Sequence, residues 1–320
     1  MMLGHFTQLT CSTVLILSAT YAHAEDALKK EEVLFKTLIR QCHGSIAKVA
    51  TDKEQSTIRQ LRIRLRMDSF HPGLAAAYIA EDGSKEIGIS GGFVLGLQSF
   101  ITAALMEDTL NKPGLADEYF KYYLSVFNYN NRRFMSVEEF SRCSAKELRS
   151  FEDAMERSGL WKALFVGSVY YVVAHEIAHH VQGTVGSVSA KESVGNERAA
   201  DRWASRRLLD LDLPASVAAA MSLLYLHQLE QSRFSLLELK THPDSLDRAI
   251  SAVDMTLPKL RDIYGKPPFN EKPLSSYKKA HESLKELLEG ARSRSKESMK
   301  DWEAVMNSMS ERAQTLFERG

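Results

Sequence analysis

The segment from Val169 to Val181 is apolar except for His175, Glu176, His179 and His180. An apolar run of this kind predicts a helix buried at the bottom of a cleft. On a helix, residues four positions apart lie one above the other, so His175 and His179 share one face. This pair therefore constrains both the burial of the helix and what must lie beside it.

The spacing favours a metal ion between the two histidines. Two imidazoles on one helical face can converge on one cation at about 2.0–2.1 Å. Glu176 lies next to them, where a carboxylate can take a proton from a water on the cation without being a ligand. The alternative is a buried helix whose histidines are only hydrogen-bonded. His180 points about 100° away from His179 on a helix, so it is expected to pack or to be partly exposed and not to be a ligand.

A catalytic zinc site needs a third protein ligand and keeps a fourth position open. Glu197 and Asp201 are four residues apart in a segment expected to be helical. One helical face can then present Glu197 to the metal, while Asp201 accepts the N–H of a ligand histidine and fixes its tautomer. The alternative is a solvated acidic pair beside Arg198 and Arg202.

Together these segments resemble the gluzincin metallopeptidases, and among them the CAAX prenyl endopeptidases, the HtpX-type proteases and their soluble periplasmic relatives. The resemblance covers about residues 57–255. Its parts are the His175 motif, the Glu197-x-x-Ala-Asp201 motif, Thr241-His242-Pro243 with Arg248, and a Gly-Gly-aromatic strand at 86–94.

The resemblance implies that His175, His179 and Glu197 bind one zinc ion per chain. It also implies that Glu176 is the general base and that Asp201 orients a histidine. The function it implies is a zinc metalloendopeptidase that hydrolyses extended or misfolded envelope proteins, with protein or peptide substrates as its partners. The alternative function is a catalytically idle zincin that acts as a chaperone-like binding protein.

His242 and Arg248 are further catalytic candidates from the resemblance. Both are expected near the metal, where His242 could fill the open position and keep the enzyme latent. From the residues alone, Thr241-His242-Pro243 also fits a helix start capped by Thr241. Arg248, His242 and Tyr225 are candidates to stabilise the oxyanion, although Tyr225 fits a core position better.

The substrate is expected to add as a strand beside Ile87–Gly92. One departure from the family pattern lies just there. The family's usual Asn-Ala pair is replaced by Lys85-Glu86-Ile87-Gly88. The resemblance therefore does not determine the shape of the substrate groove.

The amino terminus predicts export. Residues 13–20 are apolar and Ala22-His23-Ala24 is a cleavage pattern, so 1–24 is expected to be a signal peptide cleaved near Ala24. The protein would then be periplasmic or secreted. There, Cys42 and Cys143 could form a disulfide or stay unpaired.

No other stretch reaches the roughly 18 uncharged residues of a membrane span, so no transmembrane segment is expected in the mature chain. Peripheral contact with a membrane and the oligomeric state stay open. The chain has 41 basic and 41 acidic residues. This balance gives no electrostatic footprint for nucleic acid.

The expected fold is α+β and mostly helical: a zincin-like domain over 25–260, with a small, mainly antiparallel sheet and a buried metal-binding helix. A helix is expected over 25–50, and strands over 58–67, 75–80 and 86–95. Arg62, Arg64 and Arg66 alternate with apolar residues, which favours a strand with a solvated outer face.

Two capping boxes, Ser136-x-x-Glu139 and Ser144-x-x-Glu147, predict helix starts, and Gly159 is expected to end the second helix. Residues 261–320 are expected to form a Pro-containing linker and a helical extension. The apolar positions of that extension repeat at helical spacing from Trp302 to Phe317.

Overall fold

The computed structural model describes residues 24–67, 69, 71, 73, 75–128, 135–186, 190–231, 244–265 and 273–294. The expected signal peptide up to residue 23, Thr241-His242-Pro243 and the expected helix at 302–317 lie outside these residues.

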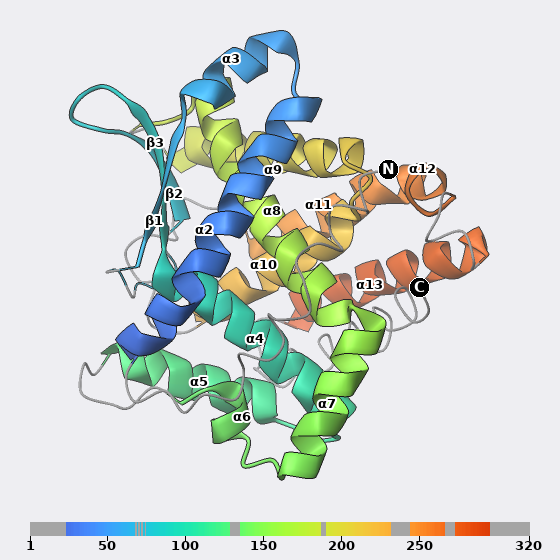
Figure 1. The fold of residues 1–320 in the computed structure, drawn as a ribbon. Coiled ribbons are helices and arrows are strands. Elements are labelled where there is room, and N and C mark those ends of the chain that lie inside the picture. The colour runs from blue at the N-terminus through green and yellow to red at the C-terminus, as the bar shows by residue number, and fades with distance from the viewer. Residues whose placement is uncertain are drawn as a thin grey trace.

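The described chain is mostly helical, as predicted, with one small sheet (Figure 1). The helices are α2 Ala24–Val49, α3 Asp52–Gln60, α4 Gly91–Thr109, α5 Leu115–Asn128, α6 Val137–Phe140, α7 Ala145–Ser158, α8 Leu160–Gln182, α9 Ala190–Asp210, α10 Ala215–Gln231, α11 Ser245–Thr256, α12 Leu260–Tyr264 and α13 Leu274–Arg294, with a 3-10 turn η4 at Leu257–Lys259. The strands are β1 Arg62–Arg66, β2 Ala75–Ile79 and β3 Lys85–Ser90.

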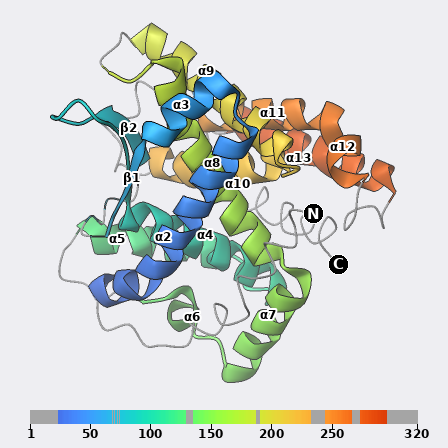
Figure 2. The same ribbon diagram turned by 45° about the horizontal axis from the view of Figure 1, so that its top comes forward.

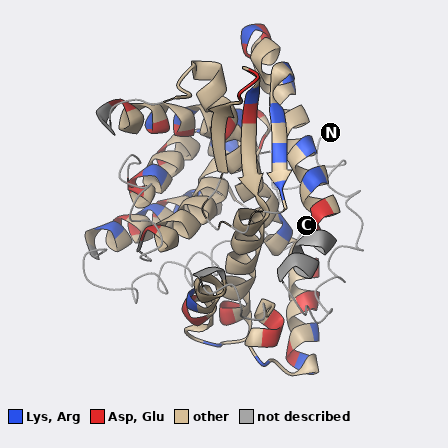
Figure 3. Ribbon diagram, turned by 90° about the vertical axis from the view of Figure 1, so that its left-hand side faces the viewer, with Lys and Arg blue, Asp and Glu red and all other residues tan. Residues whose placement is uncertain are grey.

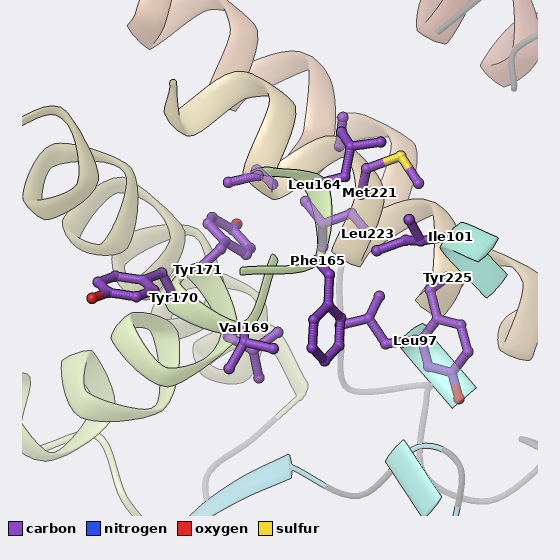
Figure 4. Close-up of a cluster of buried hydrophobic side chains, with 14 of the residues drawn as sticks. Leu97, Ile101, Leu164, Phe165, Val169, Tyr170, Tyr171, Met221, Leu223 and Tyr225 are labelled. Atoms are coloured by element: carbon purple, nitrogen blue, oxygen red, sulfur yellow. The ribbon is translucent and has the colours of Figure 1, made fainter. Parts of the chain in front are cut away.

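Helix α8 runs through the middle of the molecule, with α2, α4, α9, α10 and the sheet packed around it (Figures 1 and 2). Most of its side chains are buried, as its apolar sequence predicts. Figure 4 shows a core cluster that includes Leu97 and Ile101 of α4, Leu164, Phe165 and Val169 of α8, and Met221, Leu223 and Tyr225 of α10. Because polar side chains in such a core need partners, the histidines of α8 constrain everything packed against them.

Local signals set where α8 begins. Ser144 caps α7 through a complete capping box with Glu147, as predicted. Gly159 ends α7 in the left-handed conformation, at φ 62°, and α8 starts at the next residue. Ser136 also caps a helix, but α6 has only four residues.

The sheet is mixed, so the expectation of a mainly antiparallel sheet was only half right. The strand order is β1-β3-β2, with β2 and β3 antiparallel and β1 and β3 parallel. β2 and β3 form the predicted hairpin, in which Gly83 has φ 79°. The chain between β1 and β2 carries β2 to the far side of β3, so β3 is central.

Two predicted strands were too long, because helix caps end them. Residues 58–60 belong to α3, whose Thr51–Glu54 capping box starts a helix that buries Ile58. Residues 91–95 belong to α4, since the hydroxyl of Ser90 accepts the backbone N–H of Phe93 at 2.9 Å. The Gly-Gly-aromatic segment is therefore the start of a helix and not a strand.

The arginines of β1 lie on the exposed side of the strand, as predicted (Figure 3). They do not form a bare basic row. Arg64 pairs with the buried carboxylate of Glu86 at 2.7 Å, and Arg62 pairs with Asp82 at 3.0 Å.

Cys42 and Cys143 are both free, which resolves the alternative between a disulfide and two unpaired thiols. Within the described ranges, no helix is both long enough and apolar enough to cross a membrane.

Part of the expected extension packs on the helical body. Helix α13 lies against α11. Lys285 of α13 pairs with Asp254 at 2.6 Å and Arg292 pairs with Asp247 at 2.7 Å, so two exposed ion pairs also join the helices.

Gly96 tests how tightly this core is packed. A Cβ at Gly96 would lie 2.7 Å from the hydroxyl of Tyr123 and closer still to that of Tyr225. We expect Gly96→Ala to lower the free energy of unfolding by about 1–3 kcal/mol, the usual cost of overpacking. Urea denaturation measures it.

Gly44 is the matched control, because it lies on an exposed face of α2 with nothing within 4 Å of an added Cβ. Gly44→Ala should raise the free energy of unfolding by roughly 0.5–1 kcal/mol. Equal stability of Gly96→Ala and Gly44→Ala would contradict the close approach of the two tyrosine hydroxyls to Gly96.

Candidate metal centre

Three helices, α8, α9 and α11, bring together the side chains of the candidate site. Helix α8 supplies His175 and His179, and α9 packs along it and supplies Glu197 and Asp201. Helix α8 ends at Gln182 and α9 begins at Ala190. The four-residue spacing places each pair on one face of its helix. Because α8 and α9 pack together, the two faces meet.

The three possible ligand residues form a small triangle, in which a different oxygen of Glu197 lies near each histidine. Nε2 of His175 lies 3.1 Å from Nε2 of His179 and 3.1 Å from Oε2 of Glu197. Oε1 of Glu197 lies 3.3 Å from Nε2 of His179. Ligands at about 2.0–2.1 Å around a tetrahedral ion are about 3.3 Å apart. The three buried residues can therefore hold a metal ion with little movement.

Asp201 orients His175. Its Oδ1 lies 2.9 Å from Nδ1 of His175, which places the ring proton on Nδ1 and leaves Nε2 to face the other ligands. Tyr171 donates its hydroxyl to the same oxygen at 2.8 Å. Burial would raise the pKa of Asp201, but Arg248 and His175 hold it well below its usual range.

Arg248 of α11 lies behind Asp201. Its Nε and Nη2 donate to the two carboxylate oxygens of Asp201 at 2.7 and 2.9 Å. Nη2 is also 3.4 Å from Oε2 of Glu197. Asp244 caps α11 by accepting the N–H of Leu246 at 2.8 Å, so the alternative that Thr241 caps this helix was wrong.

Glu176 is buried between the ligand histidines and the sheet. Burial raises the pKa of its carboxyl, and the nearby His175 and His179 oppose that rise. The backbone N–H of Ala77 on β2 opposes that rise as well. The general-base candidate therefore contacts an edge strand of the sheet.

The strand order corrects the prediction that the substrate pairs with Ile87–Gly92. Residues 87–90 belong to the central strand β3, whose two edges pair with β1 and β2. A further strand has no free edge to join there. The edge beside Glu176 belongs to β2.

The remaining candidates are placed as follows. His180 faces away from the site and its Nε2 donates to the carbonyl of Glu86 at 2.8 Å, as its predicted packing role requires. Tyr225 is in the core, with its ring 5.6 Å from that of Phe93, which confirms the preferred interpretation. His242 lies outside the described residues.

Three contacts at the site were not foreseen from the sequence. Tyr171 reaches Asp201, Thr184 contacts Nδ1 of His179 at 3.0 Å, and Ala77 reaches Glu176. The sequence held a signal for two of them. Tyr171 is one helical turn before His175, and Thr184 follows a glycine of the kind that ends helices. Nothing local marked Ala77.

Comparison with known proteins supports this region as the functional part. Residues 101–263 match the model of one family, described as Peptidase U49. The match covers about half of the 320 residues and includes all the candidate ligands. Comparison with curated proteins and with solved structures gave no significant match.

The site predicts a pH dependence for the metal-free protein. Burial alone would lower the pKa of His175, but hydrogen bonds to Asp201 and Glu197 raise it from 6.5 to about 10. The folded protein therefore holds this proton more tightly than the unfolded chain does. The resulting stabilisation is complete below pH 6.5 and is lost as pH rises toward 10. The free energy of unfolding in a chelator should fall across this window.

Urea denaturation at several pH values in that window measures the fall. The control is His175→Gln, which cannot titrate and should show a weaker slope. Equal slopes for the wild type and this variant would contradict the assignment. A bound metal replaces the proton, so loaded protein should also lose the slope.

Proposed function

The chain belongs to the peptidase U49 family, and from that premise we propose that it is a zinc-dependent endopeptidase that cleaves extended or misfolded proteins. The observation that carries the proposal is the close grouping of His175, His179 and Glu197, in which one possible ligand atom of each residue lies within 4.8 Å of the others, as one bound ion requires.

We propose zinc because two imidazoles and one carboxylate are a known ligand set of catalytic zinc. A bound zinc ion would polarise the scissile carbonyl and lower the pKa of a water in its open position. His175, His179 and Glu197 would hold it, and Asp201 would keep His175 in the required tautomer.

Glu176 is our proposed general base. It lies one residue from His175 and its buried carboxyl has a raised pKa, which makes it a better proton acceptor. It would take a proton from the attacking water and pass it to the leaving amine. The nearby backbone N–H of Ala77 would help to hold the carboxylate beside the substrate.

We propose that the substrate pairs with β2 and not with β3. β2 is an edge strand, and Ala77 links it to Glu176. Strand pairing uses main-chain hydrogen bonds and so depends little on sequence. It selects extended chains, which supports misfolded proteins as the substrate class.

We propose Arg248 as a positioning residue for Asp201 and no longer as a catalytic or oxyanion-stabilising residue, because its side chain is only 5% exposed and is already engaged there. For His242 we propose the latch role implied by the gluzincin resemblance. The same resemblance supports a peptidase domain over 25–260 and the HtpX-like family.

Export is a separate proposal that rests on the apolar residues 13–20 and the pattern Ala22-His23-Ala24. Envelope proteins would then be the substrates. A mature protein whose amino terminus is not near Glu25 would contradict export without touching the catalytic proposal.

The alternative function is an idle zincin that binds unfolded chains. A closed site, with His242 as a permanent fourth ligand, would favour it. The presence of Glu176 favours the enzyme, because a purely structural zinc has no need of a base.

The deciding experiment compares the wild type with Glu176→Gln. We expect the variant to keep its zinc and to hydrolyse an unfolded protein about 10²–10⁴ times more slowly, because it loses the general base. Zinc content and the rate of cleavage are measured on the same samples. Glu282→Gln, on the exposed face of α13, should behave like the wild type.

His242→Ala tests the latch in the same assay. If His242 fills the open position, the variant should cleave faster than the wild type at equal zinc content. A wild type that binds zinc yet never cleaves, even with His242→Ala, would rule out the endopeptidase and leave the binding protein.

A further inference from the structure

We propose that Thr184 is a positioning residue for the metal centre, because its hydroxyl fixes the ring and tautomer of His179. This inference rests on the proposed zinc site and deepens it. Its basis is the contact of 3.0 Å between Thr184 Oγ1 and His179 Nδ1.

The end of α8 creates this contact. Gly183 adopts a left-handed conformation with φ 69°. The N–H of Thr184 then bonds the carbonyl of His179 at 2.9 Å, and the N–H of Gly183 bonds that of His180 at 3.3 Å. These two bonds form a Schellman motif, which folds the chain back over the last helical turn. The Thr184 side chain thereby reaches the ring of His179.

The hydrogen-bond directions agree with a metal ligand. A neutral histidine that binds through Nε2 carries its proton on Nδ1 and needs an acceptor there. The hydroxyl oxygen of Thr184 can accept that proton. Its own hydrogen can point to the carbonyl of His179, which lies 3.4 Å away. With its oxygen as the acceptor, Thr184 suits the tautomer of His179 that carries its proton on Nδ1 and leaves Nε2 for a metal ion.

The two ligand histidines are held in different ways. The partner of His175 is the buried carboxylate of Asp201, which Tyr171 and Arg248 hold in turn. The partner of His179 is a neutral hydroxyl at a half-buried turn. Thr184 therefore adds orientation without adding charge to the site.

The same turn also begins the connection to α9. Helix α9 begins at Ala190 and packs along α8, so that Glu197 faces the histidines.

The test compares Thr184→Val, which removes the hydroxyl but keeps the shape, with Thr184→Ser, which keeps the hydroxyl. We expect Thr184→Val to weaken zinc binding by about 10–100-fold, the usual cost of losing such a partner. Thr184→Ser should restore most of the affinity. The zinc dissociation constant is measured by competition with a chromophoric chelator, so no proteolysis is needed.

Thr102→Val is the control for a simple loss of stability. Thr102 lies on α4, where its hydroxyl accepts the indole N–H of Trp161 at 2.8 Å. This variant should unfold more easily and bind zinc as the wild type does. If it weakens zinc binding as much as Thr184→Val does, the positioning role is overturned.

A second measurement uses the metal-free protein. Nitrogen-15 NMR should show a larger share of His179 protonated at Nδ1 in the wild type and in Thr184→Ser than in Thr184→Val. An unchanged tautomer with unchanged zinc affinity overturns the role of Thr184. A wild type that binds no zinc defeats the zinc site instead, while the tautomer still decides whether Thr184 orients His179.

Discussion

The carboxylate of Asp201 joins the three helices on which the site depends. From α9 it accepts hydrogen bonds from His175 and Tyr171 of α8 and from Arg248 of α11. All of these groups are buried, so each needs the others to offset the loss of water. Removing one partner of a buried ion pair typically costs about 3–5 kcal/mol, because the other charge is left alone. The metal triangle is thus held from behind by a network that also fixes the packing of α8, α9 and α11.

This network explains why an apolar helix can carry polar residues through the core. Around His175, Glu176 and His180, the partners come from α9, from β2 and from β3 respectively. These three side chains thus each contact a different neighbour of α8. The site and the fold are therefore not separable, since the same contacts that satisfy these groups also position the helices.

The sheet shows how topology can move a function from one strand to another. Alternating residues and a turn correctly indicated strands near 62–66, 75–79 and 85–90. They could not show which strand is central, because pairing order is set by the path of the connections and not by local pattern. As β3 is central, the edge next to Glu176 belongs to β2, whose Ala77 had no distinguishing local feature.

The sequence by itself determined the buried helix, the four-residue spacings of His175 with His179 and of Glu197 with Asp201, and the capped helix start at Ser144. These depend on periodicity and on hydrogen bonds between near neighbours, which a sequence records directly. Tertiary structure decided the rest: the mixed sheet, the edge at β2, the turning of Arg248 toward Asp201, and the return of Thr184 onto His179. Each of these depends on how separate segments meet in space, and the burial that drives their meeting is not written in any one segment.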